Sequence, residues 1–157
     1  MNLNRRRGGA IAKAYGNAFE ALFMSACRHA GIHVVQIPMG AKVIRCRGKL
    51  TTIKVKTPFD FVLMKDGVTV MVDTKTVDGS TFPFSKITRH QLESLAHCEV
   101  FGVKAGYVVN FRETGQMAFF SSRVLSRLRP NASLIAEDGE NLGNTRSPNL
   151  FYFVVRP

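Results

Sequence analysis

Two strand-like runs meet at a tight turn in the stretch Phe59-Asp60-Phe61-Val62-Leu63-Met64-Lys65-Asp66-Gly67-Val68-Thr69-Val70-Met71-Val72-Asp73-Thr74-Lys75. An Asp-Gly pair between alternating apolar residues is the strongest short-range signal for a two-residue hairpin. With that turn, Lys65 lies opposite Val68, and the same register places Asp60 opposite Asp73. The stretch therefore predicts a hydrophobic hairpin with two acids facing each other at its open end.

Directly opposed carboxylates repel, so this pair needs a compensating charge. A divalent cation held by both acids supplies it, because hard oxygen ligands suit Mg²⁺ or Mn²⁺. Lys75 lies on the same face of its strand as Asp73, because side chains alternate with a period of two. The plainer interpretation, in which a solvated Asp at a strand end forms an ion pair with Lys75, stays open here.

Upstream of this hairpin we expect a basic arm, a helix, a strand and a second hairpin. Apolar residues recur at helical spacing over residues 11–30, after an opening stretch, residues 1–10, that reads as a flexible basic arm. Residues 32–37 read as a strand, and two short strands over residues 42–47 and 50–56 flank a turn at Gly48. The segment 40–57 is thus predicted to be a basic hairpin, while residues 130–149 read as a loop or tail.

The positive charge is concentrated in the first third of the chain. The 157 residues carry a net charge of +11, of which residues 1–57 hold +10 with Glu20 as their one acid. Such segregation favours a nucleic-acid-binding surface, although a merely solubilising basic stretch has the same charge. The segment contains nine cations that we expect to contact phosphates: Arg5, Arg6, Arg7, Lys42, Arg45, Arg47, Lys49, Lys54 and Lys56.

Composition excludes several classes of protein. Hydrophobic residues make up 45% and charged residues 21% of the chain, which is typical of a globular domain, and we expect a single domain over residues 1–157. No apolar run approaches the length of a membrane span, and no apolar segment follows the N-terminal arginines. Three cysteines without metal-binding spacing fit reduced thiols, so we expect a cytoplasmic protein with no membrane contact, from a bacterium or a virus.

The string from Asp60 to Asp73-Thr74-Lys75 resembles the catalytic signature of the PD-(D/E)XK nuclease superfamily, an acid followed by a strand bearing acid-x-Lys. That family core begins with a helix that supplies a further acid, and Glu20 lies in the predicted helix here. A helix with a Gln commonly follows the acid-x-Lys strand, and Gln91 stands near the start of such a segment.

Within the superfamily the chain is most similar to the RecU-type Holliday junction resolvases, whose core resembles that of the archaeal junction resolvases. The similarity rests on the helix motif from Gly16 to Glu20, the basic hairpin, the Asp60–Asp73 spacing and the segment from Ser80 to Ser85 followed by His90-Gln91. The central acid is Asp73, where that family usually has Glu. The resemblance implies an α/β fold with a restriction-endonuclease-like core: a central mixed β-sheet flanked by helices, with a protruding basic hairpin stalk.

Phosphodiester hydrolysis needs an attacking hydroxide, charge neutralisation at phosphorus and help for the leaving oxygen, all of which bound Mg²⁺ supplies. By this resemblance Asp60 and Asp73 are the principal metal ligands, with the carbonyl of Thr74 as a third. Lys75 contacts the scissile phosphate and activates the attacking water. Glu20 holds the metal through water or binds a second ion, and Gln91 orients Lys75 or the water.

The sequence therefore predicts a homodimeric Mg²⁺-dependent endonuclease that binds four-way or other branched DNA and makes paired symmetric nicks. A four-way junction has approximate two-fold symmetry, so two active sites in a C2 dimer match its two opposed cuts. Two alternatives remain at this point: another endonuclease of the superfamily that acts on duplex or damaged DNA, and a junction-binding protein without catalytic activity.

Overall fold

The computed structural model describes residues 3–38, 40–46, 48–150 and 153–154. Helices are α1 (Leu3–His29), α2 (Arg89–Val100) and α3 (Ser122–Leu125), with 3-10 turns η1 (Phe84–Lys86) and η2 (Ala136–Asp138). The strands are β1 (His33–Gln36), β2 (Ala41–Cys46), β3 (Lys49–Lys54), β4 (Phe61–Lys65), β5 (Val68–Val77), β6 (Phe82–Pro83), β7 (Lys104–Phe111), β8 (Gln116–Ser121), β9 (Ser133–Leu134), β10 (Glu140–Asn144) and β11 (Ser147–Pro148).

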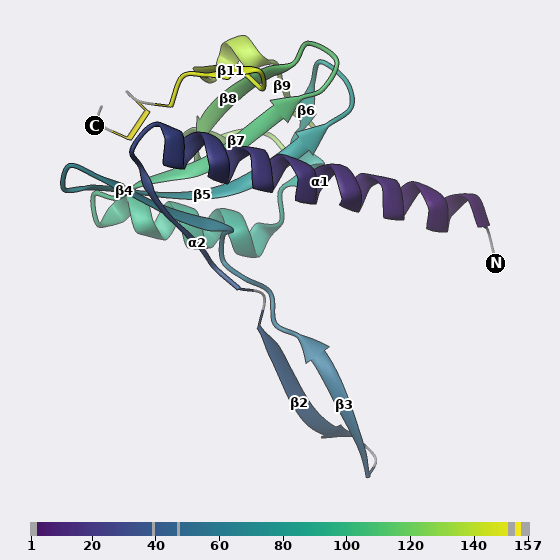
Figure 1. Ribbon diagram of the computed structural model, residues 1–157. Coiled ribbons are helices and arrows are strands. Elements are labelled where there is room, and N and C mark those ends of the chain that lie inside the picture. Colours follow the sequence, from purple (N-terminus) through teal and green to yellow (C-terminus); the bar gives the residue numbers. More distant parts are fainter. Residues whose placement is uncertain (1–2, 39, 47, 151–152, 155–157) are drawn as a thin grey trace.

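A seven-stranded mixed sheet forms the centre of the molecule (Figure 1). Its strand order is β1-β4-β5-β7-β8-β10-β11, and among the described strands only β5 and β7 pair in parallel. The parallel pair is joined through β6, η1 and α2, and that crossover places α2 against the sheet. The predicted central mixed sheet is confirmed.

The β4–β5 hairpin has the predicted register. Lys65 pairs with Val68, and the ladder continues to Phe61 opposite Val72. Asp66 and Gly67 have φ of 49° and 79°, and positive φ at both central residues is what a type I′ turn requires. Because the turn is local, the sequence was sufficient to predict the pairing.

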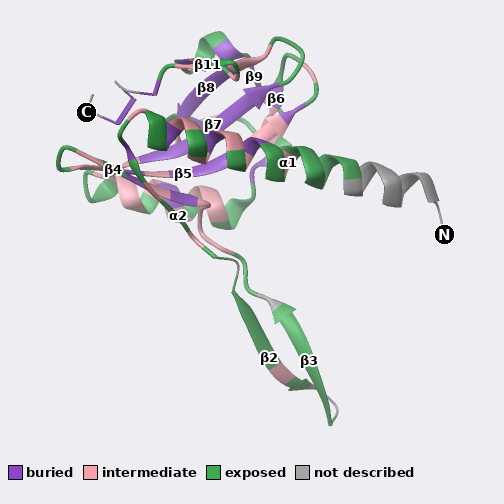
Figure 2. Ribbon diagram, in the orientation of Figure 1, coloured by how far each residue is buried: buried purple, intermediate pink, exposed green. Residues whose placement is uncertain are grey.

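Helices cover both faces of the sheet (Figures 1 and 2). On one face, Phe19 and Phe23 of α1 pack with Val72 of β5 and with other apolar residues of the sheet in one buried cluster. On the opposite face, Leu95 of α2 packs in a second cluster with Tyr107 of β7. Burial of each large apolar side chain contributes about 1.5–3 kcal/mol, so these two clusters hold the helices to the sheet.

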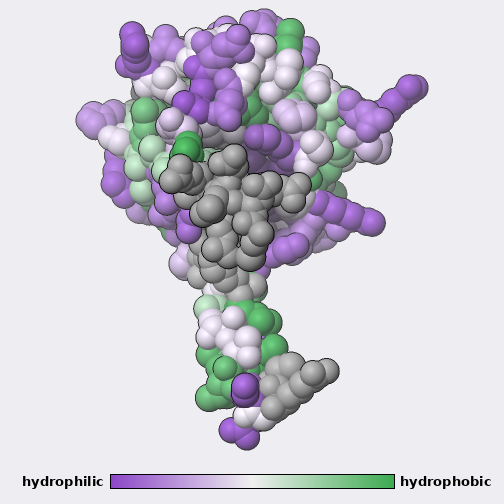
Figure 3. Space-filling view, turned by 90° about the vertical axis from the view of Figure 1, so that its right-hand side faces the viewer, coloured by the Kyte–Doolittle hydropathy of each residue, from purple (hydrophilic) through white to green (hydrophobic). Residues whose placement is uncertain are grey.

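The β2–β3 hairpin is a separate two-stranded sheet that projects from the body (Figure 1). Gly48 lies in its turn with φ of 79°, as the predicted tight turn at this position implies. The hairpin exposes apolar residues as well as cations: Val43 is 61% and Leu50 is 71% exposed. The stalk predicted over residues 40–57 is thus present, with a mixed rather than purely basic surface (Figure 3).

Two sequence predictions are wrong. Residues 3–10 belong to α1 instead of a flexible arm, and residues 1–2 lie outside the described part: the helix continues through Gly8 and Gly9, although each costs about 1 kcal/mol relative to Ala, because the arginines and alanines beside them favour helix. Residues 130–149 are also ordered: β10 pairs with β8 and extends the sheet. Strand β9 pairs with β6, so this segment folds onto the body rather than forming a loose tail.

No helix in the described part of the chain is both long and apolar enough to span a membrane.

Candidate active site

Asp73 lies at the centre of a polar cluster on β5. Its side chain is fully buried, and its two carboxylate oxygens accept hydrogen bonds from Lys75 of the same strand and Gln91 of α2. Lys75 Nζ also lies 3.4 Å from Gln91 Oε1. Gln91 is held in turn because the Thr88 hydroxyl, which caps the N-terminus of α2, contacts both its side chain and its backbone N–H. The predicted Asp73, Lys75 and Gln91 are therefore in direct contact.

Asp60 stands immediately before β4, one residue beyond the last residue pair of the ladder. Its backbone N–H donates to the Val72 carbonyl at 3.0 Å, and its Oδ2 accepts from the Thr74 N–H at 2.8 Å and the Thr74 hydroxyl at 3.0 Å. Asp60 and Asp73 thus lie on neighbouring strands, each held by its own donors. Those hydrogen bonds relieve part of the repulsion between the two carboxylates, in addition to the compensation expected from a cation or from Lys75.

Glu20 comes from α1 and reaches the same cluster from the other side of the sheet edge. It is partly buried and accepts a hydrogen bond from Gln36 Nε2 of β1 at 3.2 Å. Burial raises the pKa of Glu20, the negative charge of Asp60 raises it further, and the positive charge of Lys75 partly opposes both effects. Glu20 is therefore electrostatically part of the site rather than an ordinary surface carboxylate.

The site carries an excess of buried negative charge. The pKa of Asp73 is raised from 3.8 to about 7: burial is the largest cause, the Lys75 ammonium partly opposes it, and the charges of Asp60 and Glu20 raise the pKa further. A single lysine therefore leaves this group of three carboxylates incompletely compensated. Such a site favours binding of a cation.

Tyr107 is a site neighbour that sequence reasoning missed. It lies on β7 directly beside Asp73, and Lys75 Nζ is 5.7 Å from the centroid of its ring. Its side chain is fully buried, and its hydroxyl has no hydrogen-bond partner within the described residues. Burial, followed by the charges of Asp73 and Asp60, raises the pKa of this phenol, so it stays protonated. Tyr107 lies within an apolar stretch of the sequence, and nothing in that stretch indicates that its side chain lies beside Asp73.

The donor set matches Mg²⁺, although the side chains do not form a closed cage. Across residues 3–38, 40–46, 48–150 and 153–154, no three His, Cys, Asp or Glu side chains gather closely enough to hold a metal ion by themselves. Mg²⁺ typically binds through one or two carboxylates together with water and substrate phosphate oxygens. Asp60 and Asp73 provide those two carboxylates, and their uncompensated charge is the reason that a cation fits.

The fold provides an independent comparison. No protein-family model and no curated protein sequence matches the chain. Among solved structures, an Archaeoglobus fulgidus protein, the Holliday junction resolvase Hjc, superposes with a TM-score of 0.57 at 16% sequence identity, over 80% of this chain and 95% of that one. The fold is similar to that of an archaeal Holliday junction resolvase.

This similarity confirms the predicted restriction-endonuclease-like α/β core. A second structure, SSO0001, covers 76% of this chain and 57% of its own at 13% identity, with a TM-score of 0.40, which is too low to add to the argument. At these identities the likeness is one of fold, so the contacts described above supply the argument about individual residues.

The predicted DNA contacts lie on two extended elements. On the β2–β3 hairpin, Lys42, Arg45 and Lys49 are exposed, and exposed Lys56 follows it. Lys54 belongs to β3, Arg5, Arg6 and Arg7 belong to the first turns of α1, and Arg47 lies outside the described residues. Their role in binding DNA stays a prediction.

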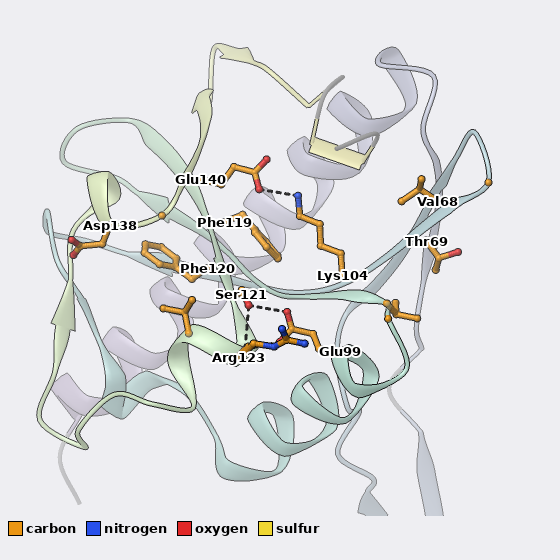
Figure 4. A pocket seen from close by; sticks show the side chains of 15 residues that line it. Val68, Thr69, Glu99, Lys104, Phe119, Phe120, Ser121, Arg123, Asp138 and Glu140 are labelled. Atoms are coloured by element: carbon orange, nitrogen blue, oxygen red, sulfur yellow. Dashed lines mark hydrogen bonds and ion pairs between the residues drawn. The ribbon is translucent and has the colours of Figure 1, made fainter. Parts of the chain in front are cut away.

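A hollow lies away from the carboxylates, at the N-terminal ends of β5 and β7 (Figure 4). It measures about 810 Å³ and is lined by Val68, Thr69 and Lys104, among others. Three of its charged groups already have partners: Lys104 pairs with Glu140, and Glu99 accepts from Ser121, Ser122 and the Arg123 N–H at the start of α3. The polar contacts of this hollow therefore connect elements of the fold, and none of the residues assigned to the candidate active site lines it.

Proposed function

We propose that this chain is a metal-dependent endonuclease of the RecU type that resolves four-way DNA junctions as a homodimer. The observation that carries the proposal is the contact of Asp73 with both Lys75 and Gln91, with Asp60 and Glu20 beside them on a resolvase-like fold. A protein that only binds DNA has no use for buried acids, since they oppose the attraction of phosphate.

The residues of the site divide the work of phosphodiester hydrolysis. Asp60, Asp73 and the Thr74 carbonyl would hold Mg²⁺, or Mn²⁺ in its place, with Glu20 acting through water or on a second ion. The bound ion supplies the hydroxide, neutralises the phosphate and stabilises the leaving oxygen. Lys75, which contacts Asp73 here, would donate to the scissile phosphate. Gln91 contacts both residues and keeps them in register.

The hairpin and the N-terminal half of α1 are proposed to hold the junction. Both extend from the body and carry the excess of positive charge (Figure 1). Phosphate contacts of this kind give affinity without sequence selectivity, so selectivity for branched DNA comes from the spacing of the two basic elements in each subunit of a C2 dimer. A two-stranded hairpin that forms a sheet of its own is marginally stable, and we expect DNA to order it.

A competition assay tests this proposal. Purified protein is incubated with equal amounts of a labelled four-way junction and a linear duplex of the same sequences, with Mg²⁺ or with a chelator. We expect paired nicks in the junction only when Mg²⁺ is present. Preferential cutting of the duplex would favour a different endonuclease of the superfamily, and metal-independent binding without cutting of either substrate would favour a non-catalytic junction binder.

The variant Asp73→Asn completes the test. Removing the carboxylate eliminates a metal ligand, so cleavage should fall by at least about a thousandfold while junction binding stays equal or becomes tighter. Asp66→Asn, at the exposed turn of the same hairpin, is the matched control and should cut normally. Cleavage by Asp73→Asn at the wild-type rate would contradict the assigned site.

A further inference from the structure

Arg112 forms a cluster with two residues that the proposed active site does not use. It directly follows β7, its guanidinium carbon lies 3.6 Å from the centroid of the Tyr15 ring on α1, and it forms an ion pair with Asp78 just beyond β5. The Arg112 N–H donates to the Val77 carbonyl at 3.0 Å, which fixes the start of the side chain. Three elements thus converge on one arginine.

This cluster lies a short way along the molecule from the carboxylates. Tyr15 precedes Glu20 by five positions on α1, which corresponds to about 7.5 Å along the helix axis. Asp78 follows Lys75 by three positions, or about 10 Å of extended chain. A DNA strand advances about 3.4 Å per nucleotide along its axis, so the cluster lies two or three nucleotides from the proposed cutting position.

Polar residues also lie on the α1 face of the sheet, opposite to the face on which Asp73 contacts Gln91 of α2. Alternation along the strands places Thr76 of β5 on the same face as Val72, which packs under α1, and Asn110 of β7 pairs with Thr76 in register. The Thr76 hydroxyl and Asn110 Oδ1 are buried without a hydrogen-bond partner in the described parts of the chain. Buried polar groups need partners, and an ordered water between Thr76 and Asn110 would provide them.

The part of α1 before Phe19 is more exposed than the part that follows. Phe19 is the first buried residue of α1 among those whose exposure is described, and the helix is more exposed toward its N-terminus (Figure 2). A Cβ added at Gly16, one turn before Glu20, would meet no atom within 4 Å. Space for a side chain therefore lies beside Gly16, whereas Phe19, three positions later, packs in the buried cluster on the sheet.

Arg112 is prepared to bind an anion. The Tyr15 ring covers one face of its guanidinium, and Asp78 is its one hydrogen-bond partner within the described residues. The side chain remains 34% exposed, so other N–H groups of the planar fork can reach a phosphate. An ion pair with Asp78, whose side chain is 80% exposed, has little value for stability, which argues against a purely structural role.

We propose that Arg112, held against Tyr15, binds a backbone phosphate of the cleaved DNA strand two or three nucleotides from the cut and so positions that strand in the active site. This inference rests on the proposed function, because it requires DNA at the carboxylate cluster. Arg112 is a positioning residue: it stands away from the reacting atoms and acts by fixing the strand.

Junction binding measured over a range of salt concentrations tests the inference, together with the position of cleavage. For Arg112→Ala we expect the slope of log affinity against log salt to become less steep by about 0.9, so the loss of affinity relative to wild type is about eightfold larger at 0.1 M than at 1 M salt. Cleavage should also spread over neighbouring positions. Tyr15→Phe keeps the ring and should behave as wild type, whereas Tyr15→Ala should share the spread of cleavage positions.

Arg127→Ala is the matched control, because it removes the same charge from an exposed position after α3, on the α2 side of the sheet. It should leave the salt slope and cleavage position unchanged. Wild-type slope and cleavage in Arg112→Ala, or an equal loss in Arg127→Ala, would overturn the inference while leaving the proposed function intact. Failure of the wild-type protein to bind junctions would overturn both.

Thermal unfolding of each variant separates a binding effect from loss of the fold. We expect Arg112→Ala to unfold near the wild-type temperature. Should it not fold, Arg112→Gln keeps the side-chain stem and a donor toward Asp78 but removes the charge, and the same loss of slope is expected. A wild-type slope in that variant would overturn the inference.

Discussion

At the scale of single residues, Asp73 couples the proposed chemistry to the stability of the fold. Its pKa of about 7 in the folded chain stands above the 3.8 of an ordinary Asp, so the folded state favours the protonated form. The stabilising effect of that proton is complete below pH 4 and is lost as the pH rises to about 7. The difference corresponds to as much as about 4 kcal/mol.

This difference gives a prediction for the metal-free protein. Its free energy of unfolding should fall between pH 5 and pH 8 by more than that of Asp73→Asn, measured by urea denaturation in the presence of a chelator. Adding Mg²⁺ at pH 8 should restore the wild type and leave Asp73→Asn unchanged, because the cation replaces the missing proton as the balancing charge. Equal pH dependence of the free energy of unfolding in wild type and Asp73→Asn would contradict the prediction. Asp66→Asn is the control and should behave as wild type.

Tyr107 offers a second test at this scale. A buried hydroxyl without a partner costs roughly 1–3 kcal/mol, so Tyr107→Phe should leave stability unchanged or raise it by about 1 kcal/mol. Denaturant unfolding of wild type and variant gives the difference. A loss of more than about 1 kcal/mol would mean that the hydroxyl is satisfied, for example by an ordered water beside Asp73.

At the scale of elements, the β2–β3 hairpin is separable from the core. Replacing Lys42, Arg45 and Lys49 together with Gln removes three predicted phosphate contacts, so the salt slope of junction binding should fall by about 2.7. The melting temperature should change little, because the hairpin forms its own sheet. The control replaces three exposed arginines of the body, Arg127, Arg129 and Arg146, and should leave the slope unchanged. Equal losses in both triple variants would assign binding to total charge alone.

The elements also show where local sequence patterns were sufficient. Asp66-Gly67 determined the β4–β5 register, since a two-residue turn leaves only one pairing for the residues beside it. The start of α1 was predicted eight residues too late. Two glycines in a row commonly interrupt a helix, but the residues beside Gly8 and Gly9 favour helix and α1 continues through them. Strand β10 was missed because Glu140–Asn144 has weak strand character and becomes a strand only beside β8.

At the scale of the whole molecule, the proposed paired nicks require two active sites. We expect a dimer by sedimentation at micromolar concentration, with or without DNA. Mixing wild type with an excess of Asp73→Asn should give hybrid dimers that nick only one strand of a junction. As the share of variant increases, the yield of resolved linear duplexes should therefore fall more steeply than the yield of single nicks. Coupled cuts by a species that sediments as a monomer would contradict the dimeric mechanism.

Charge segregation, the central hairpin and the acid-x-Lys strand were evident in the order of the amino acids, because turns, strand alternation and charge counts depend on neighbours along the chain. The approach of Glu20 and Gln91 to the Asp60–Asp73 pair, and of Arg112 to Tyr15, depended on how α1 and α2 pack on the sheet. Those contacts join residues far apart in sequence, and burial of Phe19, Phe23 and Leu95 determines them. Local patterns therefore specified the candidate catalytic residue types, while tertiary packing decided which side chains share the site.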